Sequence, residues 1–180
     1  MIRIQNKIFI GPQHSWVITN DGSLYTFGAG KYGVLGHGDD NDVSSRSAKK
    51  IEFFKYNNIK IKDCKLGLYH SIDLTETGDV YTWGYGGATS FFTKFFNNTA
   101  INALGHGNSE SYSIPKRIEF FDSIDSKIIQ IACGLYHWLA LTDKGDVYNW
   151  GCGEHGNLAL DNPNDQVLEP KLNQNLSFLK

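Results

Sequence analysis

The stretch Gly134–Asp161, GLYHWLALTDKGDVYNWGCGEHGNLALD, decides the fold because the chain contains three versions of it. An earlier version, GPQHSWVITNDGSLYTFGAGKYGVLGHG, runs from Gly11 to Gly38. Another, GLYHSIDLTETGDVYTWGYG, runs from Gly67 to Gly86 and resumes as LGHG at Leu104. Internal repetition of this kind is the signature of repeat architectures, in which each copy is one small structural unit.

The segments between the copies also match one another, so the repeats account for nearly the whole chain. KKIEFFKYNNIKIKDCKLG precedes the second copy, and KRIEFFDSIDSKIIQIACG precedes the third. We therefore expect a single repeat domain over residues 1–180, with units at about 1–58, 59–125 and 126–180.

Each unit carries four strand signals and no helical pattern of useful length. Leu139 and Leu141 share a face at period two, as expected for a strand. Gly145 suits a hairpin turn whose last residue needs a positive φ. The expected strands of one blade are 128–134, 137–143 and 146–151, with a short fourth strand of the type seen at Arg117–Phe121. Small repeated sheets pack radially. The predicted fold is all-β, a partial β-propeller of about three four-stranded antiparallel blades.

The stretch GAGKYG, Gly28–Gly33, fits the G-x-G-x-x-G pattern whose backbone amides can cradle a pyrophosphate. It recurs as GCGEHG at Gly151–Gly156, and both copies follow the second arm of a hairpin. A dinucleotide site needs this motif between a parallel strand and a helix. No helical pattern follows it here, so we expect a tight turn between blade strands, with a nucleotide site as the alternative.

The unit A-C-G-x-x-H-x-x-A-L-T-x-x-G-x-V-Y-x-W-G-x-G-x-x-G-x-L, taken from Ala132 to Leu158, resembles the repeat of the regulator of chromosome condensation family. The resemblance covers nearly the whole chain. It implies a propeller, for which the family norm is seven blades. It also implies the roles that the family has taken: guanine-nucleotide exchange on a small GTPase, chromatin attachment, and scaffolding inside larger proteins. Three units depart from that norm, which bears on ring closure and on any activity that needs the complete wheel.

The histidines follow the repeat rather than a catalytic motif. His14, His70 and His137 occupy one repeat position, so propeller symmetry places them in separate blades. A repeated structural hydrogen bond is the interpretation we favour, with a shared metal site as the alternative.

The cysteines also align with the repeat. Cys64 and Cys133 stand where other copies have Ile or Leu, and we expect them to act as small core hydrophobes. Cys152 aligns with a loop position and is the candidate reactive thiol. The chain contains no C-x-x-C, G-x-S-x-G or H-E-x-x-H motif. We therefore expect no catalytic, cofactor-binding or metal residues, and a protein that is not an enzyme.

The amino-acid composition limits the classes of partner that we expect. Lys and Arg number 17 against 19 Asp and Glu, for a net charge of -2. This balance gives no electrostatic footprint for nucleic acid or for an anionic membrane. No apolar stretch approaches the roughly 20 residues of a membrane span. Three cysteines, an odd number, argue against a disulfide framework. We expect an intracellular protein, cytoplasmic or nuclear, that binds neither membrane nor nucleic acid.

The second unit contains an insertion at 87–103 that the other two units lack. It includes Phe91, Phe92, Phe95 and Phe96, and their i, i+4 spacing would align two pairs on one side of a short helix. Insertions in repeats emerge on one face of the array, often the binding face. The four rings either fold back onto their own blade or contact a protein partner, and we name them as candidate partner-binding residues.

These observations predict a non-enzymatic protein-interaction or scaffold module, with a small GTPase as one candidate partner. The alternative is a guanine-nucleotide exchange factor for a small GTPase, or a fragment of one. An open stack of blades also leaves an apolar face at each end, at a cost on the order of 10 kcal/mol per end. Self-association, further propeller blades that close the ring, or polar protection of the ends would each relieve it.

Overall fold

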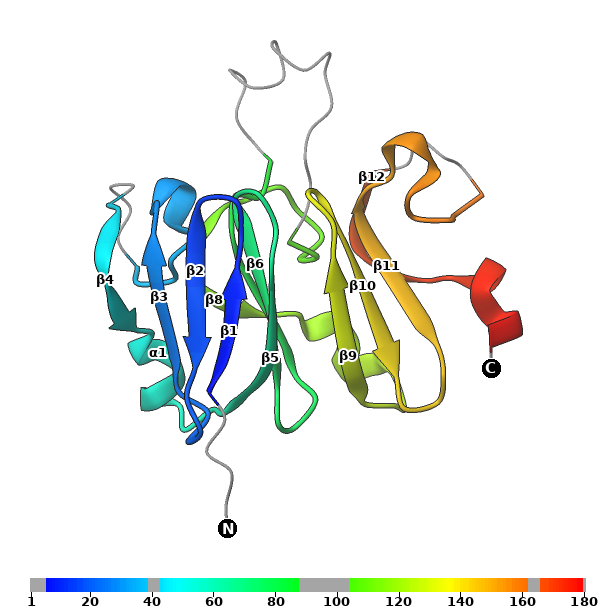
Figure 1. The fold of residues 1–180 in the computed structure, drawn as a ribbon. Helices are drawn as coiled ribbons and strands as arrows, with labels where there is room; N and C mark the ends of the chain where they lie inside the picture. The colour runs from blue at the N-terminus through cyan, green and yellow to red at the C-terminus, as the bar shows by residue number, and fades with distance from the viewer. Residues whose placement is uncertain (1–5, 39–42, 88–103, 162–165, 180) are drawn as a thin grey trace.

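The computed structural model describes residues 6–38, 43–87, 104–161 and 166–179. Strands in these residues form three separate four-stranded antiparallel sheets that stand side by side (Figure 1). Blade 1 contains β1 (Lys7–Ile10), β2 (His14–Ile18), β3 (Leu24–Gly28) and β4 (Ser45–Lys50). Blade 2 contains β5 (Ile61–Leu66), β6 (His70–Thr75), β7 (Val80–Gly84) and β8 (Tyr112–Arg117). Blade 3 contains β9 (Ile128–Cys133), β10 (His137–Thr142), β11 (Val147–Cys152) and β12 (Gln166–Leu172). The predicted all-β partial propeller of three blades is confirmed.

The two middle strands of each blade form a hairpin with the expected glycine turn. Gly22, Gly78 and Gly145 have φ values of 79°, 95° and 85°. Each of them donates its N–H to the carbonyl of the threonine three residues earlier. The predicted positive φ at this turn position is therefore confirmed in all three blades.

Short helices join or follow the strands. They are η1 (Lys31–Gly33), α1 (Glu52–Tyr56), η2 (Glu119–Ser123), η3 (Glu154–Gly156) and η4 (Gln174–Leu179). The expectation of a fourth strand at Arg117–Phe121 is wrong, because β8 ends at Arg117 and η2 follows it. Pairing with β7 finishes where the Ile118 N–H donates to the Val80 carbonyl at 2.9 Å.

The aromatic residues that follow Ile118 leave the sheet and pack against the neighbouring blade. Phe120 and Phe121 of η2 lie 5.7 and 5.8 Å, centroid to centroid, from the ring of Tyr148 in blade 3. Phe54 of α1 packs in the same manner on Tyr81 of blade 2, at 5.4 Å. The run that resembled a strand therefore serves the packing between blades.

The core of the molecule lies between the blades. One cluster joins blades 1 and 2 around Trp16, Trp83 and Cys64, which are fully buried. A second joins blades 2 and 3 around Trp138 and Trp150. Because each blade is a single sheet, its apolar residues are buried only against a neighbouring blade.

Candidate interaction edge

All loops with candidate functional residues open at one edge of the blades, which we call the loop edge. The β1–β2, β5–β6 and β9–β10 turns lie there, at the top of Figure 1. The β7–β8 connection, which contains the insertion, leaves blade 2 at the same edge after Gly87. Phe91, Phe92, Phe95 and Phe96 lie outside the described residues, so their role as partner-binding residues stays a prediction.

The glycines of the GAGKYG stretch build this edge. Gly28 has a φ of 113°, and a Cβ on it would lie 2.6 Å from the Gln13 carbonyl oxygen. The next residue, Ala29, donates its N–H to that same oxygen at 2.9 Å. Gly84 repeats the arrangement in blade 2. The expected tight turn is confirmed: the glycines let the end of one strand press against the neighbouring turn.

The repeated histidines pack against glycine instead of making a repeated hydrogen bond, so that expectation is wrong. His14 is buried, and neither of its ring nitrogens has a hydrogen-bond partner among the described residues. His70 is also buried, and a Cβ on Gly67 would lie 2.3 Å from its Nε2. In blade 3, His137 Nδ1 lies 3.0 Å from the amide nitrogen of Asn157.

Burial also sets the charge state of these rings. It lowers the pKa of His14 to about 4 and that of His70 to about 3, with His14 and His137 adding repulsion at His70. Both rings are therefore neutral near pH 7. Across the part of the chain that the structure describes, no three His, Cys, Asp or Glu residues come together as metal ligands would.

The three thiols are free. Cys64 is fully buried, as expected of a core residue, and burial raises its thiol pKa well above the usual value. Burial also raises the pKa of Cys133, to about 11. The expectation that Cys152 is a loop thiol is wrong. It ends strand β11, is buried, and donates its N–H to the Tyr136 carbonyl at 2.9 Å.

Aromatic side chains from two blades meet on the loop edge. Tyr32 of η1 lies 5.3 Å from Tyr69 and 4.6 Å from Tyr85, centroid to centroid. The ammonium group of Lys31 lies 4.8 Å from the ring centre of Tyr32 and 6.0 Å from that of Tyr69. The cluster therefore combines three aromatic rings with a cation, which the ring faces attract.

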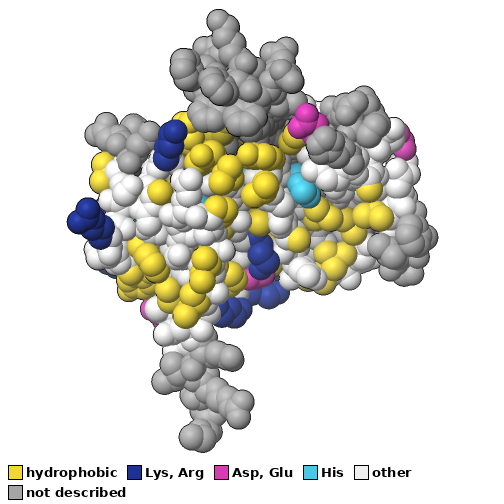
Figure 2. Space-filling view, turned by 45° about the horizontal axis from the view of Figure 1, so that its top comes forward, with side chains coloured by type: hydrophobic (Ala, Val, Ile, Leu, Met, Phe, Trp, Pro, Cys, Tyr) yellow, Lys and Arg dark blue, Asp and Glu magenta, His cyan; other side chains and the backbone are white. Residues whose placement is uncertain are grey.

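Apolar side chains continue the surface toward blade 3. Leu135 is 57% exposed, and the Leu68 N–H donates to its carbonyl at 3.4 Å, which joins the turns of blades 2 and 3. The neighbouring Tyr136 is half-buried. Burial raises the pKa of its hydroxyl, and the nearby Tyr69 raises it further. Figure 2, in which this edge is turned toward the viewer, shows hydrophobic side chains gathered across it.

Sequence reasoning did not find this cluster. Tyr69 and Tyr136 stand in matching GLYH stretches, and that repetition was the available signal. Tyr32 belongs to a different loop of a different unit, so only the packing of the blades shows that it meets Tyr69.

Three four-stranded antiparallel blades, packed side by side with their apolar cores between them, define a β-propeller repeat protein. The model of the regulator of chromosome condensation (RCC1) repeat matches residues 21–73, 102–141 and 144–180. A second RCC1 repeat model matches residues 128–157. The chain belongs to the RCC1 repeat family. Among the described residues, no helix is both long enough and apolar enough to cross a membrane.

Curated relatives share about a third of its residues. The E3 ubiquitin-protein ligase HERC2 of Mus musculus is 33% identical over 175 residues, which are 96% of this chain and 3% of that protein. The ultraviolet-B receptor UVR8 of Arabidopsis thaliana is 32% identical over 171 residues, 92% of this chain and 33% of the receptor. The chain thus spans a third or less of these relatives.

Solved structures show the same fold. Human WBSCR16 superposes with a TM-score of 0.74 and 22% identity, over 96% of this chain and 40% of that one. Prp20p of Saccharomyces cerevisiae, described with its binding to Gsp1p and histones, gives 0.72 and 21%, over 93% and 37%.

Proposed function

We propose that the chain is a protein-interaction module without catalysis of its own, and that the loop edge is its contact surface. The observation that carries this proposal is the pair of half-buried rings of Tyr32 and Tyr69 with Lys31, which lie over the buried Tyr85 and next to the exposed Leu135. Tyrosine is enriched in protein interfaces because its ring offers a large rigid area and its hydroxyl a hydrogen bond. Blade strands hold these loops in place, as a rigid scaffold does for binding loops.

The partner class follows from the chemistry of this edge. Apolar and aromatic groups dominate it, and the net charge of the chain is -2. A protein that presents an apolar patch would fit this surface. Nucleic acid, which is held mainly through phosphate contacts, would not.

Paired substitutions test the surface. Tyr69→Ser with Leu135→Ser changes the loop edge. Tyr56→Ser is the control, because it changes an aromatic residue of α1 that is 78% exposed at the opposite end of the blades (Figure 1). Affinity capture from cell extract, quantified by mass spectrometry, should lose specific partners with the loop-edge pair and keep them with Tyr56→Ser. Equal capture by all three proteins would contradict the proposal.

The insertion is part of the same proposal. We expect that replacing Phe91, Phe92, Phe95 and Phe96 with serine keeps the thermal unfolding transition and weakens capture of the same partners. If these substitutions unfold the protein, the rings belong to its core and contribute to no interface.

A small GTPase is the specific partner worth testing, with nucleotide exchange as the alternative function. Prp20p, whose structure is described with Gsp1p binding, has the same fold. Release of a fluorescent guanine nucleotide from a panel of GTPases measures exchange, and pull-down of the same GTPases measures binding alone. Binding without accelerated release would favour the interaction module. A fluorescent fusion would check the proposed cytoplasmic or nuclear location.

A further inference from the structure

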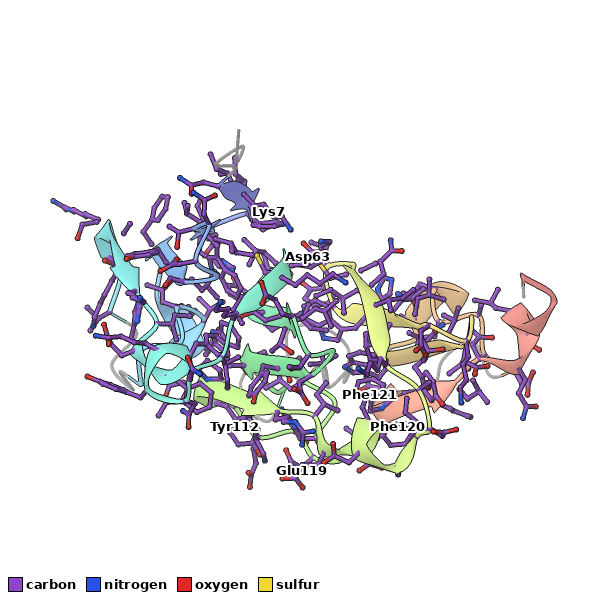
Figure 3. The ribbon with its side chains drawn as sticks, turned by 90° about the horizontal axis from the view of Figure 1, so that it is seen from below. Lys7, Asp63, Tyr112, Glu119, Phe120 and Phe121 are labelled. Carbon is purple, nitrogen blue, oxygen red and sulfur yellow. The ribbon has the colours of Figure 1, made fainter. Side chains whose placement is uncertain are left out.

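Each internal boundary joins two different blade faces. The back face of a blade contacts the preceding blade, and the front face contacts the following one. At the first boundary, Trp83 on the back of blade 2 stacks on Trp16 on the front of blade 1, with centroids 5.0 Å apart. At the second, Trp150 takes the position of Trp83 and lies 5.9 Å from Phe121, which points from η2 toward the strands of blade 3 (Figure 3).

Blade 1 stands at one end of the row, and its back face is open (Figure 1). Ile8 is 70% exposed there, whereas the residues at the same position in blades 2 and 3, Cys64 and Ile131, are 0% and 1% exposed. Ile10, two residues along the same strand, is 81% exposed. These side chains are the apolar residues that a preceding blade covers elsewhere in the molecule.

Blade 3 stands at the other end, and its front face is open. Leu139 is half-buried, whereas Trp16 and Ile72 at the same position in blades 1 and 2 are 0% exposed. Leu139, Leu141 and neighbouring residues line a shallow hollow of about 420 Å³. The hollow lies where the back face of a following blade would pack.

Each internal boundary places a glycine against a tryptophan, and both of these residues are replaced on the open faces. A Cβ on Gly36 would lie 2.8 Å from the Nε1 of Trp83, so that boundary requires glycine opposite tryptophan. Gly105 faces Trp150 at the same 2.8 Å. On the open front face of blade 3 the glycine position holds Ala159, which keeps the left-handed backbone at φ 49°.

The open back face of blade 1 has the complementary change. Phe27 occupies the position of Trp83 and Trp150. Its ring is smaller than an indole, so it leaves room for the methyl group of Ala159. Internal boundaries pair glycine with tryptophan, and the two open faces offer alanine and phenylalanine.

We propose that two copies of this chain associate head to tail, with the back face of blade 1 in one copy seated on the front face of blade 3 in the other. Phe27 of one copy then faces Ala159 of the other, and Ile8 and Ile10 become buried. Two such contacts would close a ring of six blades, within the range of about four to eight that propellers use. A head-to-tail contact closes a ring when its rotation allows it and otherwise extends into a filament.

A double-mutant cycle tests the alanine–phenylalanine match. Native mass spectrometry and sedimentation equilibrium at micromolar concentration should show a dimer or a larger head-to-tail assembly for the natural chain. Phe27→Trp should weaken association by about tenfold or more, because the larger ring meets the Ala159 methyl group. Adding Ala159→Gly should restore it, because the glycine–tryptophan pair of the internal boundaries is then re-created. A monomeric natural chain, or strictly additive effects, would overturn the proposal.

Complementation between two blocked chains tests the head-to-tail geometry. Ile8→Asp with Ile10→Asp blocks the back face, and Leu139→Asp blocks the front face. All three residues are at least partly exposed, so each variant should keep its circular dichroism spectrum and its unfolding transition. Each blocked chain alone should be monomeric, and an equal mixture should form a one-to-one dimer through the intact pair of faces. A folded mixture that stays monomeric, or blocked chains that still dimerise alone, would refute this arrangement.

Discussion

Trp16 of β2 and Trp83 of β7 stack across the boundary between blades 1 and 2, with their ring planes only 3° apart. The Trp83 indole N–H also donates to the Val34 carbonyl at 2.9 Å, and Ser71 donates its hydroxyl to the same oxygen at 3.3 Å. One tryptophan thus joins a strand of blade 2 to both a strand and a loop of blade 1.

The first prediction separates the stack from the hydrogen bond. Trp83→Phe keeps an aromatic ring at the boundary but leaves the Val34 carbonyl without the indole donor, and we expect it to lower the free energy of unfolding by about 1–3 kcal/mol. Trp83→Ala also creates a cavity and should cost about 3–5 kcal/mol. Urea unfolding measures both, with Tyr56→Ala as the exposed control. Equal stability of Trp83→Phe and the natural chain would show that the hydrogen bond contributes nothing.

The second prediction concerns Asp73, which stands where blades 1 and 3 have Val17 and Ala140. It is fully buried, and neither carboxylate oxygen has a hydrogen-bond partner among the described residues. Burial raises its pKa well above the usual value, Asp63 raises it further, and Lys65 opposes them. We expect Asp73→Ala to stabilise the protein near pH 7 by about 2 kcal/mol, because an unpaired buried polar group is removed.

The sign of the pH dependence follows from that raised pKa. Between the unfolded value near 3.9 and the folded value, the folded chain binds more protons than the unfolded chain, so the penalty of Asp73 grows as the pH rises. The advantage of Asp73→Ala should therefore shrink as the pH falls toward about 4. Chemical unfolding of both proteins across this range measures it. Destabilisation by Asp73→Ala near pH 7 would mean that the carboxylate has a stabilising partner.

The repeat period made the blades predictable, because Gly78 and Gly145 mark the same turn in units whose strands alternate at period two. The stretch Arg117–Phe121 misled, since its apolar residues satisfy a strand pattern while Phe120 and Phe121 serve the next blade. The prediction that Cys152 lies in a loop failed because β11 continues past Gly151, where the pattern placed the end of the strand.

The candidate site was less predictable than the fold. The tyrosine cluster depends on Tyr32 and Tyr69 approaching across two units, and spacing along one chain does not encode that distance. The Gly–His contacts were hidden for a related reason. A histidine repeated at one position indicates a constraint, but only coordinates show that His70 covers the backbone of Gly67.

The third prediction is acid sensitivity through the buried histidines. The pKa of His70 is lowered by burial to about 3, so below about pH 6.5 the unfolded chain binds a proton that the folded chain does not. Stability is complete above about pH 6.5 and falls as the pH decreases. At about pH 5 the loss from His70 alone is about 2 kcal/mol.

Thermal unfolding in the Asp73→Ala background measures this loss without the opposing effect of the carboxylate. His70→Gln should flatten the acid slope even though it lowers stability near pH 7. His137→Gln should flatten it less, because that ring is only half-buried and contacts Asn157. Identical slopes for His70→Gln and its parent would assign the acid loss to other groups.

The fourth prediction links the framework to the loop edge. Thr82 is fully buried, donates its hydroxyl to the Leu104 carbonyl at 2.6 Å, and lies 2.9 Å from His106 Nε2. Leu104 is the first described residue after the insertion. Thr82→Val keeps the shape of the side chain but leaves the carbonyl and the ring unpaired, so we expect a loss of about 1–3 kcal/mol.

Blade 3 supplies the control for this arrangement. At the position of Thr82 it has Asn149, whose amide donates to the Leu158 carbonyl, and at the position of His106 it has Leu160. His106→Leu should therefore cost less in the presence of Thr82→Val than in the natural chain, giving a coupling of about 0.5 kcal/mol or more in a double-mutant cycle. The Thr82 hydroxyl bonds to the residue that follows the insertion, so Thr82→Val should also weaken partner capture. Thr26→Val is the matched control, because it breaks the equivalent bond to the Leu35 carbonyl in blade 1. It should lower stability and leave capture unchanged. Equal loss of capture by both variants would mean that overall stability, and not the position of the insertion, governs binding.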